Sequence, residues 1–375
     1  MIPFARVLTY GNVVRNSKKV KQLTHDLDTL VLWEDGTLWG AGYNRYGQLV
    51  GNSSDTSVQK SYVQVTTGVD EIVSTWNSGF LIRKGGSYYC AGDIGFTGLS
   101  TSAGLYDCTS KIVLSGVTFK AIRCLSSIVF GVSTDNKLYG FTPFNTRGTL
   151  GDGTTNPSTE YKFLADGVDK IYCSGNNSFY ISTGGQLYCT GWNQNSSLGI
   201  NGSTQVNAWT LISQFVNVRD VGTAHNGTWV LNGDGRVYSV GSQANGTGSA
   251  STTYVQLPAI ASANVGERCI IGTSSATFNT FCFMNTIKNG ILFSGNMSYM
   301  GSGTNTDDKG LWSTNWLSGE LVLEDVYGYF GYESNMWFDG RKILFCGQQR
   351  YIPGYPSTNA SLQFKEVQLP PGTEF

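Results

Sequence analysis

Short apolar segments recur along the whole chain, and a polar turn pair closely follows each one. The segments are about five residues long, which suits a strand and is too short for a typical helix. They are TLVLW from Thr29, GFLIR from Gly79, IVFGV from Ile128, SFYIS from Ser178, TWVLN from Thr228, FCFMN from Phe281 and NMWFD from Asn335. The pairs are Asp35-Gly36, Gly85-Gly86, Asp135-Asn136, Gly184-Gly185, Asp234-Gly235, Asn289-Gly290 and Asp339-Gly340. Such pairs accept the positive φ of tight hairpin turns, so each copy predicts an antiparallel hairpin.

Two more strands are expected around each hairpin. One precedes it, as in EIVST, KAIRC, KIYCS and RCIIG. Another follows a long loop: YVQV at Tyr62, KIVL at Lys111, YKFL at Tyr161, WTLI at Trp209, YVQL at Tyr254, ELVL at Glu320 and KEVQL at Lys365. Each copy therefore predicts four short strands, and no segment shows a helical period.

The copies repeat about every fifty residues. A glycine ends the third strand at Gly42, Gly92, Gly191, Gly241, Gly295 and Gly347, and Thr142 holds this place in the third copy. One four-stranded sheet of this size cannot cover both of its faces, so each copy must pack against the next. Seven such copies predict an all-β fold, a seven-bladed β-propeller of four-stranded antiparallel blades over residues 20–375, preceded by an N-terminal arm over residues 1–19.

Two stretches carry a resemblance to a known family. The frame VDKIYCSGNNSFYISTGGQLYCTGWNQNSSLGING from Val168 resembles the repeat of the regulator of chromosome condensation family, and DGTLWGAGYNRYGQLVG from Asp35 is similar to its signature. The resemblance runs from Val20 to the C-terminus, is closest in copies one and four, and implies a seven-bladed propeller. One slot departs from the family, because its frequent histidine is replaced by Asp28, Ser78, Asn177 and Gly227.

Composition and charge exclude several partners. The chain has 25 basic and 26 acidic residues, and only 14% of its residues are charged. Without a net field to attract phosphates, we expect no nucleic-acid partner. No apolar run approaches the roughly 18 residues that a membrane span needs, so membrane insertion is not expected. The first residues, MIPFARVLTYGNVVRNSKK, lack the pattern of a secretory signal.

Five of the eight cysteines follow the repeat. Cys90, Cys189 and Cys346 share a slot that other copies fill with glycine or serine, and Cys124 and Cys173 share a second slot with Ser74. Exchange with glycine and serine indicates selection for small volume in a tight strand position. We therefore expect reduced, structural thiols, because no CxxC pair is present.

Candidate catalytic groups are few. His25 and His225 lie near the same slot of copies one and five, which favours a loop role, and neither has a nucleophile or metal partner at a diagnostic spacing. The repeated carboxylates at the entry to the first strands indicate structure: Asp70, Asp169, Asp220 and Glu324. Asp307-Asp308 breaks the repeat in the longest loop but is unlike a calcium loop. We expect no enzyme activity, no cofactor and no metal site.

Aromatic residues gather in the loops that follow the repeat glycines. Equivalent propeller loops emerge on one face, where tyrosine and tryptophan supply rigid contact area with a polar tip. The candidate partner-binding rim comprises Tyr43, Tyr46, Phe96, Phe144, Trp192, Tyr299, Trp312, Trp316 and Tyr351. The alternative is that these rings fill the seams between blades. Trp192, among Asn193, Gln194 and Asn195, is the strongest candidate for exposure, and the WSTNW insertion of copy six follows it.

These features favour a non-enzymatic virion protein, a component of a phage tail, collar or fibre made in the host cytoplasm. Its loops would bind a virion protein or a host surface receptor, either protein or glycan. The arm would dock on the particle through Phe4, Arg6 and Tyr10, or the segment from Phe4 to Tyr10 would add a strand that closes the ring. The alternative is a cytosolic protein-binding propeller, such as a small-GTPase nucleotide exchange factor or a protein inhibitor. Low charge and the altered histidine slots disfavour exchange.

Overall fold

The computed structural model describes residues 18–375 apart from a set of gaps. The gaps are positions 53, 77, 126, 175, 194, 203, 225–226, 242–249, 258–268, 274–280, 286–289, 297–306, 315–326, 331–333, 339–341, 349–352, 354–359, 368 and 374–375. Among the described residues, no helix is long and apolar enough to cross a bilayer.

The strands of the first four copies form four-stranded antiparallel sheets in sequence order. The first sheet contains β1 (Val20–His25), β2 (Asp28–Trp33), β3 (Leu38–Gly42) and β4 (Gln59–Thr66). The second contains β5 (Val69–Trp76), β6 (Gly79–Lys84), β7 (Ser87–Asp93) and β8 (Thr101–Asp107). The third contains β9 (Phe119–Cys124), β10 (Val129–Ser133), β11 (Leu138–Thr142) and β12 (Ser158–Ala165), and the fourth contains β13 (Val168–Cys173), β14 (Asn177–Ser182), β15 (Leu187–Trp192) and β16 (Gln205–Leu211).

The described strands of the remaining copies follow the same plan, and each of their sheets also keeps sequence order. One sheet contains β17 (Asp220–Ala224), β18 (Gly227–Leu231), β19 (Val237–Gly241) and β20 (Ser251–Gln256). The next contains β21 (Cys269–Thr273), β22 (Phe281–Asn285), β23 (Gly290–Asn296) and β24 (Asp307–Thr314). The last contains β25 (Tyr327–Phe330), β26 (Ser334–Phe338), β27 (Ile343–Gln348) and β28 (Ala360–Val367).

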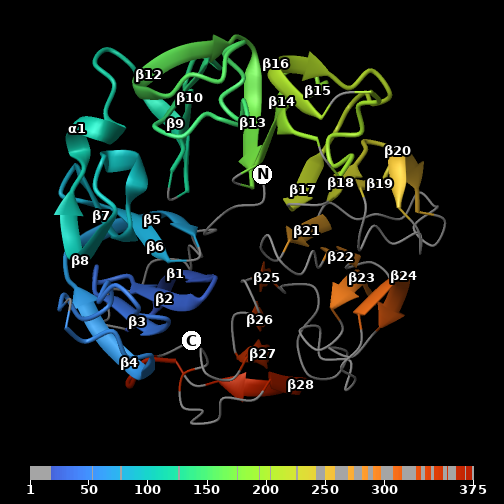
Figure 1. Cartoon of the computed structure of the whole chain (residues 1–375). Helices are drawn as coiled ribbons and strands as arrows, with labels where there is room; N and C mark the ends of the chain where they lie inside the picture. Colours follow the sequence, from blue (N-terminus) through green and yellow to red (C-terminus); the bar gives the residue numbers. More distant parts are fainter. Residues whose placement is uncertain are drawn as a thin grey trace.

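The sheets stand around a common centre, with the first strand of each nearest the axis (Figure 1). Strand β1 contacts β5, β5 contacts β9, and the series continues through β13, β17, β21 and β25 back to β1. This circle of contacts joins the first and last sheets. The expectation of an all-β propeller with four-stranded antiparallel blades is confirmed.

The outer strands of copies two and six begin earlier in the chain than expected. The first two residues of KIVL, from Lys111, lie in a one-turn helix, α1 (Thr109–Ile112), and the outer strand of this sheet is instead β8. The loop after β7 holds only the short 3₁₀ helix η1 (Gly95–Thr97), so the chain returns to the sheet sooner than in other copies. In copy six the outer strand is β24, which includes Asp307 and Asp308, so the predicted loop placement of this pair is also wrong. The expected strand at Glu320 lies outside the described residues.

The hairpin turns use positive φ as expected. φ is +83° at Gly36, +65° at Asn136 and +80° at Gly235. The turn of the second sheet has positive φ at both of its positions, Gly85 and Gly86, which lie directly between the paired residues Lys84 and Ser87. In the first sheet, Gly36 instead donates to Trp33 O at 3.0 Å across a longer turn.

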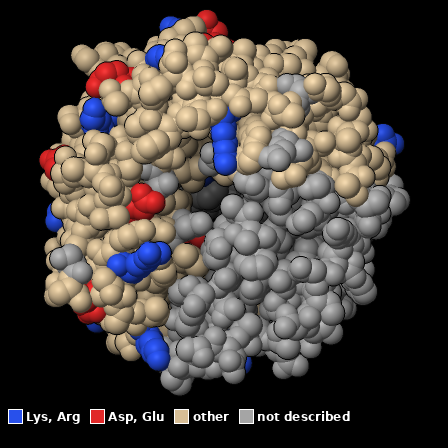
Figure 2. Space-filling view, viewed as in Figure 1, with Lys and Arg blue, Asp and Glu red and all other residues tan. Residues whose placement is uncertain are grey.

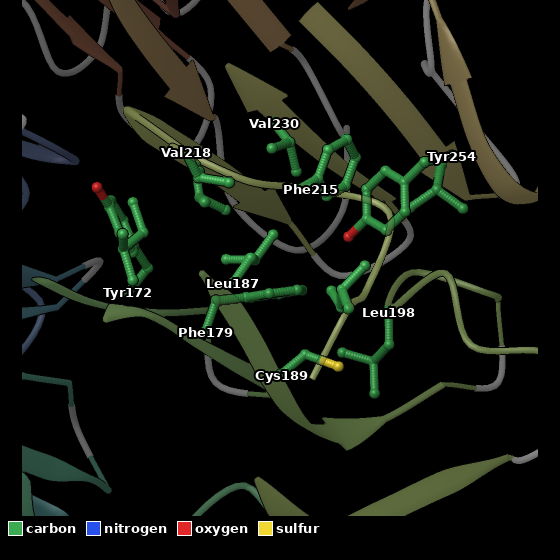
Figure 3. Close-up of a cluster of buried hydrophobic side chains, with 13 residues drawn as sticks. Tyr172, Phe179, Leu187, Cys189, Leu198, Phe215, Val218, Val230 and Tyr254 are labelled. Atoms are coloured by element: carbon green, nitrogen blue, oxygen red, sulfur yellow. The ribbon is translucent and has the colours of Figure 1, made fainter. Parts of the chain in front are cut away.

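The core lies in the seams between neighbouring sheets. A leucine seven residues after the repeat glycine position enters each of two seams: Leu49 packs with Ile72 and Phe80 of the second sheet, and Leu198 packs with Val230 and Tyr254 of the fifth. Figure 3 shows Leu198 between Cys189 and Tyr254. Burial of these side chains removes apolar surface from water, the largest favourable contribution to folding.

The small-residue slot of the third strand is tight, as the cysteine pattern predicted. A Cβ atom at Gly40 would lie 2.6 Å from Leu49 Cδ2, and one at Gly140 would lie 2.6 Å from Phe130 Cδ1. Cys90 and Cys189 occupy the same slot and are fully buried. The side chains of six cysteines are described and all six are free: Cys90, Cys108, Cys124, Cys173, Cys189 and Cys346. Burial raises the pKa of the Cys189 thiol, which keeps it in the neutral form.

Candidate interaction face

The strand connections divide the propeller into two faces. The turns between first and second strands and the long loops between third and fourth strands lie together, as shown by Tyr43 N donating to Leu27 O at 3.0 Å. We call this side the loop face. The hairpin turns and the connections between sheets form the opposite side, the hairpin face, where Val218 N donates to Gly185 O at 2.8 Å.

A repeated asparagine holds the long loops of sheets one, three and four. Asn44 Oδ1 accepts from Leu49 N at 2.9 Å, and its Nδ2 donates to Asp55 O at 2.8 Å. The same two kinds of bond recur at the other positions: Asn145 bonds Leu150 N and Thr154 O, and Asn193 bonds Leu198 N and Ile200 O. We call each of these an amide clamp. The N-x₄-L spacing was visible in the sequence but did not enter the prediction.

Each amide clamp links the loop face to the core. All three asparagines are buried, at 4% exposure or less, and the leucine amide that each one bonds carries a side chain inserted into a blade seam. A buried backbone N–H without a partner would cost about 1–3 kcal/mol, so the clamp resists any loop conformation that breaks it. The loops are therefore fixed in shape although they lie at the surface.

An aromatic and arginine cluster lies where the loop after β11 meets the fourth sheet. The Arg147 guanidinium carbon lies 3.9 Å from the ring centroid of Trp192, and the same guanidinium donates to Asn176 Oδ1. Arginine stacked on tryptophan is a favourable cation–π pair. Phe144 lies in the same loop as Arg147 and is 64% exposed, the largest exposed fraction among the described large apolar side chains.

The loop after β11 also rests on the neighbouring sheet. Gly153 N donates to Asn207 O at 2.9 Å, and a Cβ at Gly148, where φ is +66°, would lie 2.3 Å from Asn207 Oδ1. Glycine is thus needed at 148 both for its backbone conformation and for the close approach of the outer strand. The cluster is built across two blades.

A second group of polar aromatic side chains lies in the loop after β3. Tyr43 and Tyr46 are half-buried, and the Arg45 guanidinium carbon lies 5.8 Å from the Tyr46 ring centroid. A hydrogen bond with Tyr43 raises the pKa of Arg45, which stays charged in any case. The loop face thus carries an arginine beside an aromatic ring in two separate places.

The structure places the remaining predicted rim residues elsewhere or does not describe them. Phe96 is buried, with a ring centroid 6.1 Å from that of Trp76, so it fills the seam between sheets two and three and is no part of an exposed rim. Trp312 belongs to the outer strand β24 and to no insertion, a further correction. The predicted positions Phe4, Arg6, Tyr10, Tyr299, Trp316 and Tyr351 lie outside the described residues.

The described histidine is not in a loop. His25 ends β1, is 4% exposed, and its Nδ1 lies 2.9 Å from Thr29 Oγ1. Its ring makes an edge contact with Phe345 at 5.0 Å. Burial lowers the pKa of His25 to about 3, so it is neutral at ordinary pH. The predicted loop role is therefore wrong for His25, and His225 lies outside the described residues.

The carboxylates at the first strands join blades, as their repetition indicated. The Tyr172 hydroxyl donates to Asp220 Oδ1 at 2.8 Å across the seam, and Lys120 Nζ lies 3.7 Å from Asp169 Oδ1. Over the part of the chain that is described, no cluster of three or more histidine, cysteine, aspartate or glutamate side chains could hold a metal ion. Charged groups are scattered over the described part of the face seen in Figure 2 and form no large patch of one sign.

No family model matches the chain. Among solved structures, human WBSCR16 is similar with a TM-score of 0.67 and 17% identity, over 84% of this chain and 85% of that one. Yeast RCC1 (Prp20) bound to Kap60 gives 0.65 and 14%, over 83% and 78%. Prp20p from Saccharomyces cerevisiae, a protein studied for its binding to Gsp1p and histones, gives 0.63 and 13%, over 83% and 80%. The chain shares the fold of the RCC1-like propellers.

These matches correct the predicted location. The similar structures are a human protein and a yeast protein, and they point away from a virion. The virion location rested on loop composition and on the resemblance of a short N-terminal segment to phage attachment sequences. Glycine and asparagine have structural roles here, because turns with positive φ use both residues and the amide clamps use asparagine. The phage assignment therefore has no support in the fold.

Proposed function

We propose that this chain is a seven-bladed protein-binding propeller that holds a partner protein on its loop face. The observation that carries the proposal is the cluster formed by Phe144 and Arg147, on the clamped loop after β11, with Trp192 at the end of β15. Tryptophan, tyrosine and arginine dominate the energetics of protein interfaces, and they do so best when they are fixed before binding. The stacking of Arg147 on Trp192 and its bond to Asn176 supply this preorganisation.

Protein binding requires no catalytic residue, which agrees with the few candidates that the sequence offered. The solved propellers of similar fold also support the class of function, because yeast RCC1 is bound to Kap60 and Prp20p binds Gsp1p and histones. Nucleotide exchange and protein inhibition are both activities within this class, and the identity of the partner distinguishes them.

The test compares two positions of equal exposure on opposite faces. Phe144 is 64% exposed on the loop face, and Val216 is 63% exposed in a connection on the hairpin face. The photoreactive residue benzoylphenylalanine is placed at one position or the other in the full chain, which is then irradiated in cells of its source organism. We expect a discrete protein adduct from position 144, absent from position 216 and reduced by Arg147→Ala.

Mass spectrometry of the adduct identifies the partner. Equal adducts at both positions, or a 144 adduct that Arg147→Ala leaves unchanged, would show that the loop face is not the binding surface. Each variant is checked for the same melting temperature as its parent, since a loss of fold would remove adducts for an unrelated reason.

A further inference from the structure

Asp28 is the one described buried carboxylate whose oxygens both lack a hydrogen-bond partner. It begins β2, is 2% exposed, and neither Oδ1 nor Oδ2 has a partner within hydrogen-bonding geometry among the described residues. An ionised carboxylate in such a place costs several kcal/mol, because burial removes its water and nothing replaces it. The burial of Asp28 without a hydrogen-bond partner therefore has to be explained, whereas the same carboxylate at the surface would be solvated by water.

The fourth sheet shows what this position normally does. Asp28 pairs with Gly42 across the strands as Asn177 pairs with Gly191, so the two residues are equivalent. With its amide oriented to suit its neighbours, Asn177 donates to Asn176 O at 3.0 Å and to Trp192 O at 2.6 Å, and accepts from Ser197 Oγ at 2.8 Å. The amide thus fastens the start of the long loop to the turn between the first two strands.

In the first sheet, the two backbone groups beside Asp28 that correspond to Asn176 O and Trp192 O are also carbonyl acceptors. Leu27 O and Tyr43 O stand where Asn176 O and Trp192 O stand, since Tyr43 N bonds Leu27 O as Trp192 N bonds Asn176 O. Gln48 replaces Ser197 as the donor: one N–H of its Nε2 bonds Tyr43 O at 3.0 Å, and the second N–H remains available to Asp28. A carboxylate among carbonyl oxygens is repelled, whereas a carboxylic acid has an O–H to donate, as the asparagine amide has N–H.

We propose that Asp28 is a neutral carboxylic acid that fastens the first loop of the loop face and releases it when the proton is lost. The groups around it agree. Burial and the Asp26 carboxylate raise the pKa of Asp28 well above its usual range, while the Gln48 amide and the Asp28 backbone N–H lower it less. His25, at the end of β1, is neutral, and the Tyr43 phenol bonds Arg45.

The sign of the pH dependence follows. Because the folded pKa lies above the unfolded value of about 3.9, the folded chain holds a proton that the unfolded chain gives up between these two values. The stability contributed by Asp28 is complete below about pH 4 and is lost as the pH rises through the folded pKa. The loop that carries Tyr43 and Tyr46 is then loosened at high pH, and with it one part of the loop face.

Reciprocal variants test the proposal in the full chain. Asp28→Asn supplies the amide permanently, so its melting temperature should match the wild type near pH 4 and exceed it increasingly toward pH 8. Asn177→Asp moves the acid to the fourth sheet and should lower the melting temperature increasingly over the same range. If this variant does not fold at neutral pH, it is prepared at pH 4–5 and titrated upward.

Hydrogen exchange locates the effect. Relative to Asp28→Asn at each pH, the wild type should lose protection over residues 43–49 as the pH rises and keep it over residues 192–200. Parallel melting curves for wild type and Asp28→Asn at every pH would overturn the proposal. So would a melting temperature that calcium or magnesium raises in the wild type but not in Asp28→Asn, since the carboxylate would then be an ionised cation ligand.

Discussion

The amide clamp makes a quantitative prediction at Asn145. Its side chain is fully buried, accepts from Leu150 N at 3.0 Å and donates to Thr154 O at 3.0 Å. Asn145→Ala removes both of these bonds and a longer one from Nδ2 to Asp152 Oδ1 at 3.4 Å. Each of the first two bonds contributes about 1 kcal/mol net, and the Leu150 N–H left buried without a partner adds a desolvation cost of about 1–3 kcal/mol. The two bonds and the desolvation cost together give an expected loss in the free energy of unfolding of about 3–5 kcal/mol.

Asn156 provides the matched control in the same loop. It is exposed, and no side-chain hydrogen bond of Asn156 is seen in the described structure, so Asn156→Ala should change stability by less than about 0.5 kcal/mol. Both variants and the wild type are compared by urea unfolding monitored by tryptophan fluorescence and by circular dichroism, and the two probes must give coincident transitions for the free energies to be valid. Equal stabilities of the two variants would refute the clamp.

Three further predictions concern burial. Phe96→Ala should lower the free energy of unfolding by about 3–5 kcal/mol and Phe144→Ala by less than about 0.5 kcal/mol, measured by the same urea unfolding; similar losses would contradict the assigned burial. Leu198→Ala should cost about 2–5 kcal/mol for the cavity it leaves in the seam, and a neutral effect by calorimetry would show that the seam collapses around it. The C2 proton of His25 should not titrate between pH 5 and 8 in NMR spectra, because its folded pKa of about 3 lies below the unfolded value; the neutral ring favours folding above about pH 6.5, and that stability is lost as the pH falls toward 3.

The short apolar segments and the turn pairs between them were enough to predict most of the fold. SFYIS from Ser178 lies within β14 and TWVLN from Thr228 overlaps β18, because the length and apolar content of a segment depend only on the local chain. The outer strand of the second sheet was misplaced because it depends on how long the preceding loop is, and η1 makes that loop short. Apolar content alone favoured Lys111–Leu114, whereas the unpaired edge of β7 selected Thr101–Asp107.

Side-chain environment was harder to predict than the fold. Phe96 and Phe144 follow the glycine slot at similar distances, yet one fills a seam and the other is exposed, because η1 turns Phe96 inward. The rim prediction treated the loops as equivalent, and they are not. The replaced histidine of the family is visible at Asp28 in the sequence, but the acceptor groups beside Asp28 come from two segments, the turn before β2 and the loop after β3, and meet only in the folded chain.

The most direct test of the central claim is the affinity for the partner identified by cross-linking from position 144. Isothermal titration of the purified full chain should show binding weakened at least about tenfold by Trp192→Ala or Arg147→Ala, each a loss of about 1.4 kcal/mol or more, and unchanged by Val216→Ala. Affinities that these three substitutions leave equal, in variants with unchanged melting temperatures, would contradict the assignment of the loop face as the protein-binding surface.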